Sequence, residues 1–184
     1  WRGGFHQKSV GSAWMILKNY LHTLPGFQFL SDSDVEHVAA AMRVDEFPNE
    51  HVFIYQDRLN QELYLLLDGQ VDVTHYGITG RYYKLKTLQP GEFFGLPSLS
   101  TGKPAVTACT ARGPVKVASL PFSAYLLLYQ PDSEIGCHFQ FVIATQLARD
   151  LGERHDTLRN LLAQVYGGVE KRGVSTEVIA VRAR

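Results

Sequence analysis

The sequence predicts an α+β fold, mainly β, in which an antiparallel sandwich or barrel has helices before and after it along the chain. Short apolar runs with β-like alternation, separated by turn residues, fill the stretch from Arg43 to Leu120, and this spacing is typical of antiparallel sheets. Helical periodicity precedes that stretch and returns after it. A chain of 184 residues, 45% apolar and 20% charged, is sufficient for one globular domain with a full core.

Residues 1–26 form a lead that contains one short helix. Apolar residues recur at helical spacing over Trp14–Leu24, and Pro25-Gly26 ends this helix. A second helix is predicted over Val35–Met42, because its apolar residues share one face and residues 31–34 supply capping side chains in front of it.

The strands are predicted where apolar residues alternate with polar ones between turn signals. Asp68-Gly69 is predicted to form the tight turn of a hairpin, since glycine accepts a positive φ without strain. Gly113-Pro114 is predicted to separate the last two strands in the same way. The predicted strands are Val52–Tyr55, Glu62–Leu67, Gln70–His75, Arg81–Leu88, Ala105–Ala111 and Val115–Leu120.

Two helices and a tail are predicted after the strands. Pro121 suits the first turn of a helix over Phe122–Tyr129. A long helix runs from about 133 to 166, and Gly167-Gly168 is predicted to stop it. The tail, 167–184, contains the strand-like run Val174–Val181, which suits a linker, the first strand of a following domain, or a segment that folds back.

The stretch Gly91–Ala111 carries the strongest functional signal. Two glycines bracket an apolar pair in Gly91-Glu92-Phe93-Phe94-Gly95, and a Gly-Lys-Pro turn follows at 102–104. If Leu96–Leu99 forms a helical turn, its free backbone N–H groups make an anion site, and Pro97 suits the first turn of that helix. The floor of the resulting pocket would be apolar, made by Phe94, Leu96, Leu99, Ala105 and Val106.

This stretch resembles the phosphate-binding cassette of cyclic nucleotide-binding domains, whose pattern is Gly-Glu-x-Phe-Gly-Glu-x-Ala-Leu, a loop, then Pro-Arg-x-Ala-Thr-Val-x-Ala. The resemblance covers about Phe27–Val165 and implies a jelly-roll-like double-stranded β-helix, or β-roll, over about 43–120, with helices over 121–166. In the family, the second Glu and the Arg hold the ribose hydroxyl and the cyclic phosphate. Here these two positions are Leu96 and Ala105. The implied ligand-binding positions are Phe94, Gly95, Leu96, Pro97, Ser98, Lys103, Ala105, Val106 and Thr107.

A loop just upstream also matches the family, which has Gly-Glu-x-Gly or Gly-Asp-x-Ala there. The matching positions are Asp57, Arg58, Leu59 and Asn60. Because Asp and Asn tolerate left-handed backbone best after glycine, the loop geometry is expected to survive. Lys103 is interpreted either as a solvated loop lysine or as a weaker replacement for the missing arginine.

The resemblance implies a non-catalytic, cytoplasmic regulatory domain that is part of a larger signalling protein. With the two polar anchors replaced, we expect cyclic AMP or cyclic GMP to bind weakly or not at all. Two alternatives stay open. One is a degenerate dimerisation or docking module without a ligand, and the other is a sensor of a different small anion, such as a cyclic dinucleotide.

The long helix carries a candidate seam for self-association. Its apolar residues step alternately by three and four, and Arg154 interrupts the heptad pattern once. The alternative is a helix packed on its own β-roll. Gly152 beside the seam suits a hinge or a close contact. A homodimer is expected to form through Leu147, Leu151, Leu158 and Leu161.

Composition argues against several other classes. The net charge is zero, which gives no global field for nucleic acid. Cys109 and Cys137 are predicted to be buried hydrophobes in a reducing compartment, and the seven histidines show no metal-ligand spacing. No apolar run is long enough for a membrane span. No hydrolase, phosphate-loop or zinc-protease motif is present, so we expect no enzyme.

Overall fold

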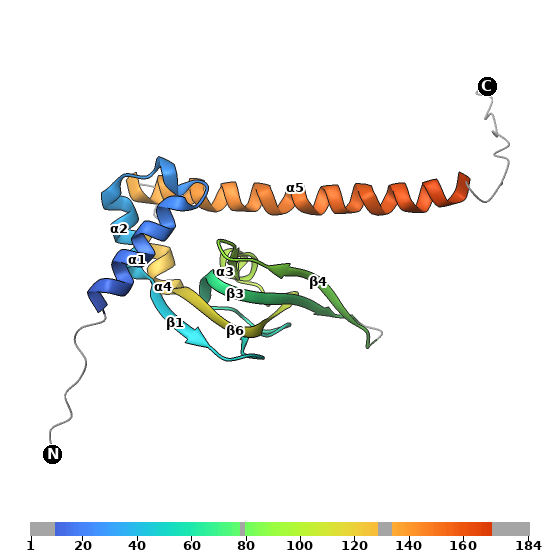
Figure 1. The fold of residues 1–184 in the computed structure, drawn as a ribbon, viewed down its shortest axis with the longest axis horizontal. Coiled ribbons are helices and arrows are strands. Elements are labelled where there is room, and N and C mark those ends of the chain that lie inside the picture. Colours follow the sequence, from blue (N-terminus) through green and yellow to red (C-terminus); the bar gives the residue numbers. More distant parts are fainter. Residues whose placement is uncertain (1–9, 78–79, 129–133, 171–184) are drawn as a thin grey trace, which may run out of the picture. The chain divides into compact units, whose positions relative to one another are not determined.

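The computed structural model describes residues 10–77, 80–128 and 134–170, and it divides into two compact units, 1–146 and 147–184. The first unit contains the sheet and the helices that pack on it (Figure 1). Within the described ranges, no helix has both the length and the apolar character needed to cross a membrane.

Two helices precede the strands, as predicted. They are α1 (Val10–Thr23) and α2 (Asp32–Ala41), joined through the short 3-10 helix η1 (Phe27–Phe29). Ser31 caps α2, because its Oγ accepts a hydrogen bond from the Asp34 backbone N at 3.2 Å. The capping run predicted from the sequence is therefore confirmed.

The strands form one antiparallel sheet that curls into a roll. Its strand order is β1-β6-β3-β4, while β2 pairs with β6 and β5 pairs with β3. The long strands β3 and β6 form the centre, with Tyr64 opposite Ser119 and Leu65 opposite Ala118. The strands are β1 (Arg43–Phe47), β2 (Val52–Ile54), β3 (Glu62–Tyr76), β4 (Tyr82–Leu88), β5 (Phe93–Phe94) and β6 (Ala108–Pro121).

The predicted hairpin at Asp68-Gly69 is wrong. The strand β3 continues through this point, and its register against β6 shifts on both sides of Asp68. Gly69 does have a positive φ of 86°, and a Cβ there would lie 2.6 Å from the Pro114 carbonyl oxygen. The glycine therefore serves a bulge inside a strand, where two backbones approach closely, and not a turn.

The predicted break at Gly113-Pro114 is also wrong, for the same reason. The strand β6 is continuous, and Gly113 keeps a positive φ of 84° within it. Its backbone N donates to Asn49 Oδ1 at 2.6 Å, so a side chain from a distant loop satisfies the irregular position. The sequence does not predict β1 and β5, which are short and depend on pairing with longer strands.

The core consists of two clusters on opposite faces of the central strands. Along β3, Leu63 and Leu65 face the helices, while Tyr64 and Leu66 face the inside of the roll. We call these the helix-side cluster and the roll cluster. The helix-side cluster includes Leu21, Phe27, Val35, Leu96, Leu99, Leu120 and Phe139, and the roll cluster includes Phe53, Val71, Phe94, Ala105, Cys109 and Val117.

Two helices follow the strands, α4 (Phe122–Leu128) and α5 (Glu134–Glu170). The predicted stop at Gly167-Gly168 is wrong, because α5 continues through both glycines, and it also continues through Gly152. Glycine lowers helix propensity by about 1 kcal/mol but ends a helix only where the backbone turns left-handed. The tail run 174–181 lies outside the described residues.

Candidate functional site

The cassette has the backbone that the sequence predicts. After β5, Gly95 adopts a left-handed conformation with φ 92° and caps the short helix α3 (Leu96–Thr101). The backbone N of Leu99 donates to the Gly95 carbonyl at 3.2 Å, and Pro97 lies in the first turn. A second left-handed glycine, Gly102, ends the helix. The turn predicted over 96–99 is thus confirmed as a helix.

Two polar side chains near α3 form hydrogen bonds with backbone groups. Asn60 Nδ2 donates to the carbonyl oxygens of Glu62 at 2.6 Å and of Gly95 at 3.0 Å. The buried Ser98 Oγ donates to the Lys103 carbonyl at 2.6 Å and accepts from the Asn60 backbone N at 3.3 Å. These bonds lock the cassette to the upstream loop. The sequence predicts only a backbone preference for Asn60 and does not indicate this role.

The upstream loop pairs directly with position 105. Asp57 has a positive φ of 62°, so the expectation of left-handed backbone is confirmed for this residue. Its N donates to the Ala105 carbonyl at 2.7 Å, and the Ala105 N donates to the Arg58 carbonyl at 2.8 Å. Two residues of one chain segment therefore face one residue of the other, which is the pattern of a G1 bulge with aspartate in the place of glycine.

The two positions that hold the ligand in the family belong to different cores here. Leu96 is 4% exposed and packs in the helix-side cluster, whereas Ala105 is 8% exposed and packs in the roll cluster. Neither offers a hydrogen-bond donor or acceptor from its side chain. The cassette therefore keeps its backbone shape and has apolar side chains at both anchor positions.

The other predicted site residues differ in their exposure. Val106 is 70% exposed, so the prediction that it forms part of the pocket floor is wrong. It lies at a bend before β6, whereas the adjacent Ala105 is buried in the roll cluster. Lys103 and Pro97 are exposed, and Thr107 is half-buried. Within the described part of the chain, Lys103 forms no ion pair.

Aromatic rings fill the roll beside the cassette. Tyr64 and Phe94 stack with centroids 5.0 Å apart, and Phe53 contacts both rings edge-on at 5.4 Å. Burial is the main cause that raises the pKa of Tyr64 well above its usual range, and the nearby Glu62 carboxylate raises it further. Burial also raises the pKa of the Cys109 thiol to about 12, which keeps this group neutral and unreactive. Any ligand in the roll must therefore meet an apolar, aromatic surface.

The second cysteine contradicts the prediction that both are buried. Cys109 is buried, as expected, but Cys137 in α5 is exposed. Helical periodicity placed it near the start of a helix without deciding which face it occupies. Within the described residues, no group of three or more His, Cys, Asp or Glu side chains is arranged to hold a metal ion.

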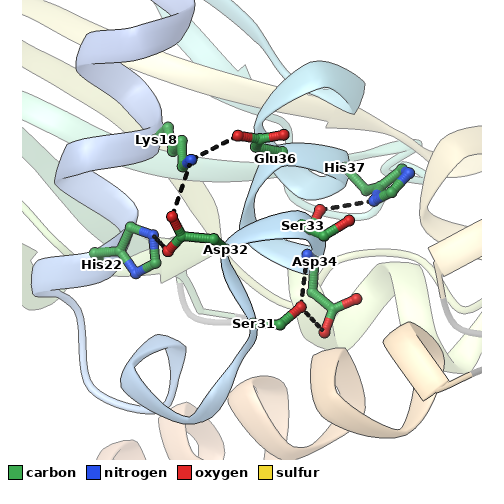
Figure 2. Close-up of polar contacts among 8 residues, drawn as sticks. All are labelled: Lys18, His22, Ser31, Asp32, Ser33, Asp34, Glu36 and His37. Carbon is green, nitrogen blue, oxygen red and sulfur yellow. Dashed lines mark hydrogen bonds and ion pairs between the residues drawn. The ribbon is translucent and has the colours of Figure 1, made fainter.

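A separate polar cluster joins the N-terminal helices (Figure 2). Lys18 of α1 lies 2.6 Å from Glu36 and 3.4 Å from Asp32 of α2. On the other side of α2, Asp34 accepts from Ser31 Oγ at 2.9 Å and contacts His138 Nδ1 of α5 at 3.2 Å. These contacts link α1, α2 and the start of α5, so we assign the cluster a structural role.

The predicted seam of the long helix lies in the second unit. Leu147, Leu151 and Leu158 are 44%, 70% and 55% exposed in the single chain. The side chain of Leu161 lies outside the described residues. Exposure of this kind leaves the seam available for a partner, and dimerisation stays a prediction.

Comparison with known proteins finds a match to one protein family. Residues 44–132 match the cyclic nucleotide-binding domain family. The chain is 27% identical over 124 residues to a cAMP-dependent protein kinase regulatory subunit of Pyricularia oryzae, covering 67% of this chain and 31% of that subunit. The corresponding subunit of Blastocladiella emersonii is 25% identical over 116 residues, covering 63% and 29%. The chain thus spans about a third of the length of these curated relatives.

Solved structures share the fold. A cyclic nucleotide-binding domain from Methylobacillus flagellatus superposes with a TM-score of 0.72 at 18% identity, covering 81% of this chain and 84% of that one. The regulatory subunit of a cAMP-independent protein kinase A from Trypanosoma cruzi, bound to guanosine, gives 0.61 at 18% identity, covering 75% and 52%. Its Trypanosoma brucei counterpart, a triple variant bound to cAMP, gives 0.56 at 19% identity, covering 72% and 52%. The stretch 44–132 of this chain thus matches the cyclic nucleotide-binding domain family, in agreement with the fold of these structures.

Proposed function

We propose that this domain is a non-catalytic regulatory module of a larger, cytoplasmic signalling protein, and that it binds cyclic AMP and cyclic GMP weakly or not at all. The observation that carries the proposal is the pair of buried apolar side chains at the anchor positions, Leu96 and Ala105. The similarity to regulatory subunits of protein kinases supports a regulatory role.

The missing arginine sets the size of the expected effect. A hydrogen bond to a charged group is worth roughly 1.5–3 kcal/mol, which corresponds to about 10- to 100-fold in affinity. Loss of the glutamate contact at position 96 lowers the affinity further. In the T. brucei variant bound to cAMP, one of the three substitutions introduces an arginine in place of threonine, which agrees with a need for this side chain. We therefore expect a Kd for cyclic AMP no tighter than about 10 μM.

A second candidate ligand is an uncharged nucleoside. The roll offers stacked aromatic rings and no buried cation at position 105, which suits a ligand recognised through a base and a sugar. The guanosine-bound structure from T. cruzi shares this fold. Two further alternatives are a cyclic dinucleotide and a docking module without any ligand.

Calorimetric titration tests these alternatives. Cyclic AMP, cyclic GMP, guanosine and a cyclic dinucleotide are titrated into the whole chain under the same conditions. A sub-micromolar Kd for cyclic AMP would contradict the proposal. A tighter Kd for guanosine than for cyclic AMP would favour the nucleoside.

Restoring the two anchors tests the cassette itself. The double variant Leu96→Glu with Ala105→Arg is expected to gain tenfold or more in cyclic AMP affinity, because the backbone of α3 is already formed. The matched control is Leu85→Arg, which adds an arginine at an exposed position of β4 outside the cassette. Thermal unfolding checks that each variant folds. No gain in a folded double variant would show that the loop lacks the geometry of a cyclic nucleotide site.

A further inference from the structure

We propose that Arg58 supplies the cation of this cassette and contacts the anionic group of a nucleotide at its rim. This inference rests on the proposed function, since it concerns the same site. It assigns a role to a residue of the upstream loop that lies far in sequence from the cassette.

The backbone places Arg58 opposite the position where the arginine is missing. In the G1 bulge at Asp57, the Ala105 N donates to the Arg58 carbonyl at 2.8 Å. This bond makes residue 58 a backbone neighbour of residue 105 across the bulge. An arginine side chain is long and flexible, so a guanidinium on residue 58 can reach the rim of the cassette beside residue 105.

The loop that carries Arg58 is held in place. Gln56 donates through Nε2 to the Tyr76 carbonyl at 3.0 Å, and its Oε1 accepts from the Tyr76 N at 2.7 Å. The Arg58 N donates to the Tyr55 carbonyl at 3.3 Å and closes the turn. The loop is thereby fixed to β3 through Gln56 and closed by its own turn, which holds the backbone of Arg58 in place.

The guanidinium itself rests on an aromatic ring. Its central carbon lies 5.5 Å from the centroid of the Tyr55 ring, within the range of a cation–π contact. Both side chains are exposed. Stacking on one face leaves the edge N–H donors of arginine open to an anion, and that planar edge suits two parallel hydrogen bonds to phosphate oxygens.

The charge of Arg58 is not neutralised. Several basic side chains of the roll pair with acids, as Lys84 does with Asp72 at 2.8 Å and Lys86 with Glu92 at 2.7 Å. Among the described residues, Arg58 pairs with no carboxylate. Lys103 is likewise unpaired and lies two residues before Ala105, so it can add a second, weaker attraction.

Matched ligands isolate the phosphate contact. Guanosine and cyclic GMP share a base, and only cyclic GMP carries a phosphate, so the ratio of their affinities reports the anion contact. Calorimetry on the whole chain at low salt is expected to give cyclic GMP an advantage of about tenfold, with its Kd still no tighter than about 10 μM. In Arg58→Gln this advantage should disappear while guanosine affinity stays unchanged, and Arg58→Lys should keep part of it.

Arg81→Gln is the control, because it removes an exposed arginine outside the cassette loop. Loss of the advantage in Arg58→Gln alone supports the proposal. An advantage that persists in Arg58→Gln overturns it, as does equal binding, or no binding, of the two ligands by the wild type. These outcomes are separate from the proposed function, which a sub-micromolar Kd for cyclic AMP would contradict.

Discussion

Substituting Gly95 by alanine should destabilise the protein far more than the same change at Gly102. Both glycines have positive φ, 92° at Gly95 and 64° at Gly102, so each substitution carries a conformational penalty of roughly 1–2 kcal/mol. Their surroundings differ. A Cβ on Gly95 would lie 2.7 Å from Asn60 Nδ2 and 2.8 Å from the Glu62 carbonyl oxygen, whereas a Cβ on Gly102 would meet nothing within 4 Å.

The close contacts at Gly95 cannot be relieved cheaply. Asn60 Nδ2 can rotate away only by losing its bonds to the carbonyls of Glu62 and Gly95. The Glu62 carbonyl is main chain at the start of β3, where the residue pairs with Pro121 of β6. Steric overpacking of this kind adds roughly 1–3 kcal/mol. Gly95→Ala should therefore lower the free energy of unfolding by about 2–5 kcal/mol, against about 1–2 kcal/mol for Gly102→Ala.

Urea denaturation followed by circular dichroism measures both free energies of unfolding. The slope of the transition should stay the same in the two variants, since a change would indicate an altered unfolded state. An equal loss of stability at the two glycines would refute the reasoning, because it would show that α3 can move away from Asn60 and β3 without penalty.

Three other predictions concern charge, assembly and the tail. Burial alone would raise the pKa of Asp34, but hydrogen bonds from Ser31 and His138 lower it below its usual value. A carboxyl group whose pKa is lowered by folding stabilises the folded state at neutral pH. This stabilisation is lost as the pH falls through the folded-state pKa. The stability gap between wild type and Asp34→Asn should therefore shrink below about pH 4 in pH-dependent denaturation. Replacing Leu151 and Leu158 by Glu should convert a dimer into a folded monomer, and a wild type that sediments as a monomer at high concentration would contradict this. Slow hydrogen exchange over 174–181 is expected if the tail docks on the roll or a partner, whereas exchange at the rate of an unfolded peptide would identify a linker.

Local patterns predicted the elements better than their connections. The capping serine, the presence of each helix and the helical turn after Gly95 follow from neighbouring residues, and the structure confirms them. Local patterns fail at Gly69 and Gly113, because a positive φ occurs both in a turn and in a bulge. Only the partner strand decides between the two, and the pairing of β3 with β6 joins residues that are far apart in sequence.

The candidate functional site could likewise be predicted from the sequence only in part. The sequence is sufficient to recognise the cassette and its two replaced anchors. It does not reveal that Asn60 holds Gly95 from 35 positions away, or that Val106 points outward while Ala105 points inward. These features depend on tertiary contacts. The pattern of residues along the sequence shows the residue type at each position but does not reveal those contacts.

The geometry explains how the cassette can keep its shape without its usual ligand contacts. Leu96 and Ala105 each belong to a core cluster, and Asn60 and Ser98 bind backbone groups instead of facing an open site. The contacts that hold α3 therefore come from the protein's own side chains. A site formed in this way presents a fixed backbone whose ligand preference is set by the few side chains at its edge. Arg58, stacked on Tyr55 and opposite Ala105, is the cation that the bulge at Asp57 brings to that edge.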